Sequence, residues 1–161
     1  MEKYSRIKAL ISLDAIRYNF EQMKKNIKEG TKIIAVIKAD AYGHGAVPIA
    51  RMLEEFDYIW GFAAATAQEA LQLRKAGITR PILILGLVFE EYYKKLAEND
   101  VRMAVCDYET ARKFNKAAEA AGKKGLIHLA ADTGMTRIGF KDREESLEEI
   151  RRIAALPNVE I

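Results

Sequence analysis

The sequence has few of the residues that would cross-link the chain, carry it into a membrane or bind a metal. It has one cysteine, which excludes an internal disulfide and favours a reducing compartment, so we expect a cytoplasmic protein. Its two histidines, His44 and His128, have no neighbouring cluster of cysteines or carboxylates, so we predict no metal site. No apolar run is long enough to span a bilayer, and residues 1–11 are too polar for a secretory signal.

The sequence also lacks a strong excess of positive or negative charge. The 26 basic and 23 acidic residues are spread along the chain and leave a net charge of +3, without an arm or stripe that would favour nucleic acid. Half of the residues are hydrophobic, and 161 residues are enough for one domain with its own core. We therefore expect a globular protein with no nucleic acid and no membrane as partner.

Apolar runs of strand length alternate with segments of helical periodicity along the whole chain. Strands are predicted at residues 33–37, 58–64, 81–85, 101–106, 126–131 and 159–161. Helices are predicted at residues 14–30, 46–53, 66–77, 89–98, 107–122 and 142–155, with Thr66 and Glu69 at capping-box spacing and Asp107 as a further cap. The alternation of Ile7, Ala9 and Ile11 predicts one more short strand over residues 6–13, ahead of the first helix.

Strands that alternate with helices in this way indicate a parallel sheet with right-handed crossovers. A complete (β/α)8 barrel needs about 250 residues. We therefore predict an α/β fold, a partial (β/α)8 TIM-type barrel of about five βα units with a leading N-terminal strand, over residues 1–161 and ending near the start of the sixth strand. Because such a segment exposes two sheet edges, we expect a homodimer or association with a missing C-terminal part.

The chain is organised around residues 33–45, IIAVIKADAYGHG. An apolar run typical of a strand buried on both faces leads directly to Lys38. Burial lowers the pKa of a lysine below its solution value of about 10.4, and a neutral amine forms a Schiff base with an aldehyde; the alternative is that Lys38 ends the strand and reaches water. Gly43 and Gly45 predict a tight loop before the next helix, so Lys38 lies at the C-terminal end of its strand, where α/β barrels carry their chemistry.

Two stretches resemble the signatures of a known family. AVIKADAYGHG at residues 35–45 resembles the pyridoxal-phosphate attachment motif of bacterial alanine racemases, and HLAADTGMTRIGF at residues 128–140 is similar to that family's second signature. The resemblance covers essentially all of this chain but only the first part of the family's chain. It implies the N-terminal, pyridoxal 5′-phosphate-binding barrel portion of an alanine racemase, without the C-terminal β-domain, whose parent enzyme makes D-alanine for the peptidoglycan of the bacterial cell wall. We expect the fragment alone to be weak or inactive.

The resemblance also implies roles for individual residues. Lys38 holds the cofactor and then removes and returns the α-proton of alanine on one face. Tyr42 binds the cofactor phosphate, Leu85 packs near the cofactor ring, and Arg137 reaches both the cofactor's phenolic oxygen and the substrate. The base for the opposite face is, in the family, a tyrosine from the C-terminal domain of the partner subunit, and no residue of this chain matches it.

The chain departs from the family pattern at Ala130, where many members have a carbamylated lysine that orients the arginine. We expect a small anion such as chloride, or another carboxylate, to take that place beside Arg137. Two alternative functions stay open: a pyridoxal-phosphate-binding protein without turnover, against which the run KADAYGHG argues, and a racemase acting on serine, lysine or another amino acid.

Overall fold

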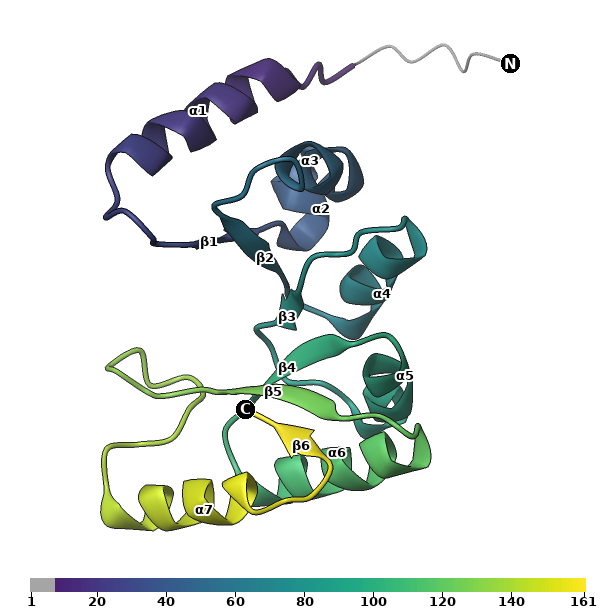
Figure 1. The fold of residues 1–161 in the computed structure, drawn as a ribbon, viewed down its shortest axis with the longest axis vertical. Helices are drawn as coiled ribbons and strands as arrows, with labels where there is room; N and C mark the ends of the chain where they lie inside the picture. The colour runs from purple at the N-terminus through teal and green to yellow at the C-terminus, as the bar shows by residue number, and fades with distance from the viewer. Residues whose placement is uncertain (1–7) are drawn as a thin grey trace.

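The computed structural model describes residues 8–161, and in this range the chain forms one parallel sheet in the order β1-β2-β3-β4-β5-β6 (Figure 1). The strands are β1 (Ile33–Val36), β2 (Ile59–Ala64), β3 (Ile82–Ile84), β4 (Val101–Val105), β5 (Gly125–Leu129) and β6 (Val159–Glu160). The helical segments are α1 (Leu13–Lys25), α2 (Lys38–Gly43), α3 (Ala46–Leu53), α4 (Ala67–Lys75), the 3-10 turn η1 (Glu90–Tyr92), α5 (Tyr93–Glu98), α6 (Tyr108–Ala120) and α7 (Glu144–Ala154). Neighbouring strands in the sheet follow one another in sequence, so the predicted partial barrel is confirmed.

Local sequence signals set several helix starts as predicted. The side chain of Thr66 accepts the N–H of Glu69, and Glu69 accepts the N–H of Thr66, which completes a capping box at α4. Asp107 accepts the N–H of Thr110 at 2.7 Å and caps α6. None of the helices in residues 8–161 is long and apolar enough to cross a membrane.

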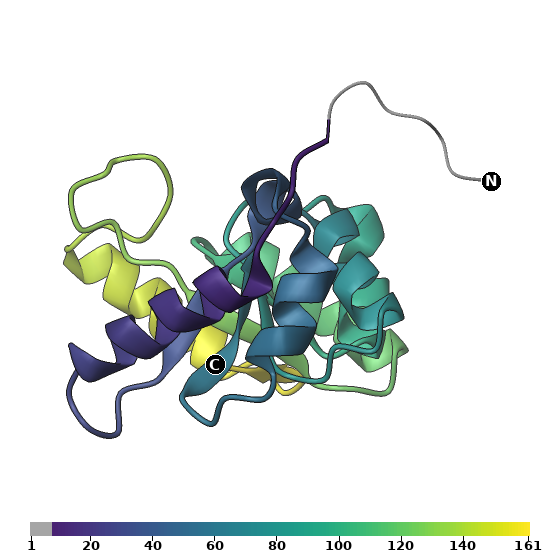
Figure 2. The ribbon, with the colours of Figure 1, turned by 90° about the horizontal axis from the view of Figure 1, so that it is seen from above.

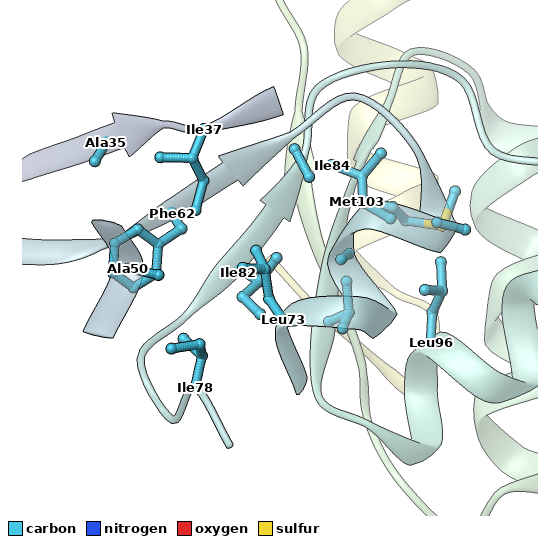
Figure 3. Close-up of a cluster of buried hydrophobic side chains, with 14 of the residues drawn as sticks. Ala35, Ile37, Ala50, Phe62, Leu73, Ile78, Ile82, Ile84, Leu96 and Met103 are labelled. Atoms are coloured by element: carbon cyan, nitrogen blue, oxygen red, sulfur yellow. The ribbon is translucent and has the colours of Figure 1, made fainter. Parts of the chain in front are cut away.

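The hydrophobic core lies between the sheet and helices α3 to α6, which run along one side of it (Figure 1). Figure 3 shows how side chains from strands and helices meet there, among them Ala35, Ile37, Phe62, Ile82, Ile84, Met103, Ala50, Leu73 and Leu96. Full burial of one large apolar side chain contributes roughly 1.5–3 kcal/mol. Because successive strand residues face opposite sides, Ile34 and Val36 of β1 lie on the other face and are 37% and 44% exposed.

That second face of the sheet carries a small polar and aromatic cluster. The rings of Trp60 and His128 meet edge to face at 5.8 Å, and the guanidinium of Arg102 lies 5.2 Å from the centre of the Trp60 ring. Burial, and secondarily the charge of Arg102, lowers the pKa of His128 below its ordinary value. His128 is therefore favoured in its neutral form.

The predicted strand ahead of the first helix is wrong within the described residues. Residues 8–12 form no strand, and α1 begins at Leu13; residues 6 and 7 lie outside the described range. A strand needs a neighbour to accept its backbone hydrogen bonds, yet the segment before α1 leads away from the sheet, so residues 8–12 lie beside no strand (Figure 1). Leu10 is 91% exposed, so apolar alternation alone misled the prediction.

Two arginines tie together the connections at the N-terminal edge of the sheet. Arg80 donates to the backbone carbonyls of Glu54, Phe56 and Ile59. Arg74 donates to the carbonyls of Ile78, Arg80, Asn99 and Asp100. Both side chains are partly buried, and together they fix the loops that lead into β2, β3 and β4.

Candidate active site

A pocket of about 550 Å³ opens at the C-terminal edge of the sheet, where β1, β2 and β3 end. It is lined by Lys38, Ala65, Leu85, Gly86, Leu87, Arg137 and Ile138. Its volume lies within the range of about 300–1,000 Å³ typical of small-molecule sites. The structure thus brings Lys38, Leu85 and Arg137 together from three separate parts of the sequence.

Lys38 is half-buried and begins a turn of unusual handedness. The four residues after it all lie in the left-handed region, with φ between 50° at Ala39 and 55° at Tyr42, and none of them is glycine. Such a conformation costs roughly 1–2 kcal/mol per non-glycine residue. The sequence predicted a tight loop here, with positive φ at Gly43 and Gly45, and the structure has both; it did not predict the left-handed turn before them.

Two carboxylates hold this turn in place. Asp40 Oδ1 accepts the N–H of Ala46 at 2.7 Å and so connects the turn to the start of α3. Glu69 Oε1, on α4, accepts the N–H of Ala39 at 2.9 Å, directly after Lys38. The strained backbone is therefore stabilised by bonds both within the segment and from a neighbouring helix.

Tyr42 and His44 lie in the same segment but do not line the pocket. Tyr42 is 62% exposed, so its side chain is accessible to solvent beside the turn. His44 Nδ1 lies 2.9 Å from the carbonyl oxygen of Ala41, a hydrogen bond within the segment. In residues 8–161 no group of three or more side chains is arranged to hold a metal ion.

The wall of the pocket opposite the turn is formed by Leu85 and Gly86, just after β3. Leu85 is 39% exposed, and its N–H donates to the carbonyl of Ala64 at 2.9 Å. A Cβ on Gly86 would lie 2.7 Å from the carbonyl oxygen of Ala65, so only glycine allows the two backbones to approach this closely. Sequence analysis missed Ala65 and Gly86, although their positions directly after two predicted strands were the available signal.

Arg137 is placed by the loop of residues 130–140, which projects beside α7 in Figure 2. The carboxylate of Asp132 accepts the N–H of Thr136 at 2.8 Å and that of Gly134 at 3.1 Å, and these bonds hold its pKa below the ordinary value. The base of the loop is closed by Phe140, whose N–H donates to Ala130 O at 2.7 Å. Hydrogen bonds within the loop therefore hold its backbone in place.

Arg137 is exposed, and within residues 8–161 it forms no ion pair and no side-chain hydrogen bond. No carboxylate of the described residues takes the place that Ala130 leaves beside it, so a carboxylate from outside this range stays a prediction. A small anion at this position stays a prediction. Lys38 likewise forms no ion pair with an acidic side chain in the described range.

Comparison with known proteins places this site in a family. Residues 11–161 match the family model described as alanine racemase, N-terminal domain. The chain is 41% identical over 153 residues to an alanine racemase of Methanococcus maripaludis, covering 95% of this chain and 41% of that protein. It is 44% identical over 161 residues to an alanine racemase of Clostridium kluyveri, covering 99% of this chain and 40% of that protein.

Solved structures of racemases also resemble this chain. An alanine racemase of Clostridium difficile 630, in complex with cycloserine, superposes with a TM-score of 0.91 at 42% identity over 94% of this chain and 41% of that chain. A histidine racemase from Leuconostoc mesenteroides superposes with a TM-score of 0.83 at 31% identity over 92% of this chain and 40% of that chain. The chain therefore spans 40–41% of the length of these proteins. Together with the family match, these likenesses show that the chain belongs to the alanine racemase N-terminal domain family.

Proposed function

We propose that this chain forms the cofactor-binding part of a pyridoxal-phosphate-dependent alanine racemase, which interconverts L-alanine and D-alanine. The observation that carries the proposal is the pocket in which the amine of Lys38, the apolar wall at Leu85 and the guanidinium of Arg137 converge. The family membership and the alanine racemases among its relatives support the same conclusion.

The residues present fit pyridoxal 5′-phosphate. The pocket has room for a small aromatic molecule, and Leu85 offers it an apolar wall. In this proposal the amine of Lys38 would bond the cofactor's aldehyde and Arg137 would donate to its phenolic oxygen. The hydroxyl of Tyr42, which lies outside the pocket lining, would donate to its phosphate. Lys38 and Arg137 suit these roles because neither forms an ion pair with a carboxylate within the described residues.

When bound, pyridoxal phosphate delocalises the electron pair left behind by the α-proton of alanine. The task of the protein is then to move that proton at a defined position. Once the substrate's amino group has displaced Lys38 from the cofactor's aldehyde carbon, Lys38 Nζ would take the α-proton on one face in one direction of the reaction and supply it there in the other direction. Arg137, which stays charged, would orient the reacting groups through its fixed donors. Inversion requires a second acid on the opposite face, and we propose that it comes from outside this chain, in a further domain of a partner subunit.

The proposal includes a homodimer and a cytoplasmic location. A second subunit is supported by the edges of the sheet, since within residues 8–161 β1 pairs with β2 alone and β6 with β5 alone. Parallel edges of this kind are normally covered in a folded protein. The reducing compartment is supported by the single cysteine, Cys106, which is not paired.

A racemase of another amino acid is the second candidate. The observation in its favour is the histidine racemase from Leuconostoc mesenteroides, which shares the fold of this chain at 31% identity. The same pocket and the same lysine chemistry would suit another amino acid, because the proton is removed from the α-carbon of the substrate whatever its side chain is. Turnover assays of the parent enzyme with alanine, serine, lysine and histidine separate the two.

The first experiment is an absorbance titration of the purified chain with pyridoxal phosphate, followed by borohydride reduction and peptide mapping. We expect a reduced label confined to Lys38. Lys38→Ala should abolish the label, and Lys141→Ala, which removes an exposed lysine just beyond the Arg137 loop, should leave it unchanged. Labelling spread over many surface lysines, with no preference for Lys38, would contradict the proposal.

A further inference from the structure

The carboxylate of Glu69 does more than cap its own helix. One oxygen, Oε2, accepts the N–H groups of Ala65 at 2.8 Å and Thr66 at 3.4 Å, which is the part that the capping box requires. The other oxygen, Oε1, accepts the N–H of Ala39 at 2.9 Å, across 30 residues of sequence. Glu69 thus connects the start of α4 to the backbone directly after Lys38.

The Ala39 N–H belongs to the same planar peptide group as the carbonyl of Lys38. This peptide plane also contains the Cα of Lys38, which carries its side chain. A hydrogen bond that fixes the Ala39 N–H therefore restrains the direction in which the Lys38 side chain extends. Other bonds of the segment stay within it: Ala41 N–H donates to Ile37 O at 2.9 Å, and Gly45 N–H donates to Asp40 O at 2.9 Å. The bond from Ala39 is different because it crosses to another helix.

We infer that Glu69 is a positioning residue for the amine of Lys38: by accepting the Ala39 N–H, it holds the left-handed turn in the orientation that directs this amine into the pocket. Glu69 does not line the pocket and forms no ion pair with Lys38 or Arg137. It acts through the backbone alone. The inference rests on the proposed function of Lys38 and adds to it a residue outside the two signature motifs.

Only a carboxylate of this length satisfies all three donors. In Glu69→Gln one oxygen becomes an amide NH₂, so a donor would face either Ala39 N–H or the Ala65 and Thr66 N–H groups. In Glu69→Asp the charge stays at the helix start, but the side chain is one methylene shorter and does not span both sides. Thr66→Ala is the matched control, because it removes the acceptor of the Glu69 N–H at 3.3 Å and leaves the bond to Ala39.

The experiment compares the wild-type chain with Glu69→Gln, Glu69→Asp and Thr66→Ala by two measurements. The first is amide hydrogen exchange at Ala39, with Met103 of the buried strand β4 reporting that the fold is intact. The second is the fraction of Lys38 labelled by pyridoxal phosphate and borohydride. Both Glu69 variants should speed exchange at Ala39 and reduce Lys38 labelling, each by about tenfold, and Thr66→Ala should change either value by less than about twofold.

The inference is overturned if a folded Glu69 variant labels Lys38 as the wild type does, or if Thr66→Ala lowers labelling equally. Glu69→Asp decides the question if Glu69→Gln does not fold, since it retains the negative charge at the helix start. Failure of the proposed function looks different: the wild-type chain would then show no label at Lys38. In that case faster exchange at Ala39 in the variants, with Met103 unchanged, would still establish that Glu69 holds the turn.

Discussion

The two edges of the sheet hold their loops mainly with side chains of opposite charge. At the N-terminal edge, partly buried guanidinium groups of Arg74 and Arg80 donate to backbone carbonyls. At the C-terminal edge the relation is reversed, and the carboxylates of Asp40, Glu69 and Asp132 accept backbone N–H groups. Glu54 is an exception at the N-terminal edge, because its carboxylate accepts the N–H groups of Thr79 at 2.7 Å and Arg80 at 3.0 Å. The two edges thus differ in which side-chain charge predominates.

The difference follows from the direction of the helices. A helix that returns antiparallel to its strands leaves free carbonyls at the N-terminal edge of the sheet and free N–H groups at the C-terminal edge. Arginines suit the first and carboxylates suit the second. The basic side chains Lys38 and Arg137 at the C-terminal edge have no acidic partner within residues 8–161. In the function we propose, the N-terminal edge serves stability and the C-terminal edge binds the cofactor.

The largest expected effect comes from breaking the N-terminal edge with Arg80→Ala. The free energy of unfolding should fall by about 3 kcal/mol, because several partly buried carbonyls lose their donor at once. Urea unfolding followed by circular dichroism measures this. Arg51→Ala, which removes one exposed bond to Ala76 O, is the control and should cost less than about 0.5 kcal/mol. Equal losses in the two variants would argue against a special role for Arg80.

Gly86→Ala should disturb the C-terminal edge through its backbone. The added Cβ would lie 2.7 Å from Ala65 O, so β2 and β3 must move apart, at a cost of about 1–3 kcal/mol. Lys38 labelling by pyridoxal phosphate should fall as well, since both residues line the pocket. Leu87→Ala, at a neighbouring exposed position, should leave stability within about 0.5 kcal/mol. A Gly86→Ala chain as stable as the wild type would contradict the close approach.

Arg137→Gln should separate binding from stability. Because the side chain is exposed and unpaired in the described residues, unfolding should change by less than about 0.5 kcal/mol. The affinity for pyridoxal phosphate, from the absorbance titration, should fall about tenfold through loss of a charge-assisted hydrogen bond. Lys141→Gln, the control, removes a positive charge near the same loop and should preserve the affinity. If it weakens binding equally, general electrostatics rather than Arg137 is responsible.

The smallest effect concerns pH and His128. Its pKa is lowered in the folded state by burial and by Arg102, so the unfolded chain binds a proton more readily. Stability should therefore fall as pH decreases below the ordinary value of 6.5 towards the folded pKa, and should be unaffected by this group above 6.5. Urea titrations at several pH values measure the slope. His128→Gln should reduce the slope in this window; an unchanged slope would show that other groups produce it.

Much of the fold was predictable because its signals are local. The capping box at Thr66 and Glu69 and the cap at Asp107 involve residues a few positions apart, so spacing alone identifies them. The extra strand over residues 6–13 failed for the opposite reason, since alternation says nothing about whether the chain brings that segment to a sheet edge. Met23 continues the apolar spacing of Ile16 and Phe20 in α1, yet it is 44% exposed.

The candidate site was predicted in its residues but not in its geometry. Sequence motifs singled out Lys38 and Arg137, whereas Ala65 and Gly86 were missed because neither carries a reactive group. Glu69 was recognised only as half of a capping box, since nothing local indicates that its second oxygen reaches Ala39.

By itself, the sequence determined the alternation of strands and helices, the helix starts and the family motifs around Lys38 and Arg137, because these depend on residues close together in the chain. The tertiary structure alone decided that residues 39–42 turn left-handed and that Leu85 and Arg137 meet Lys38 at one pocket. The physical reason is that a strained backbone is stable only where distant groups satisfy its hydrogen bonds. Those groups are brought within reach only when β1, β2 and β3 pair side by side.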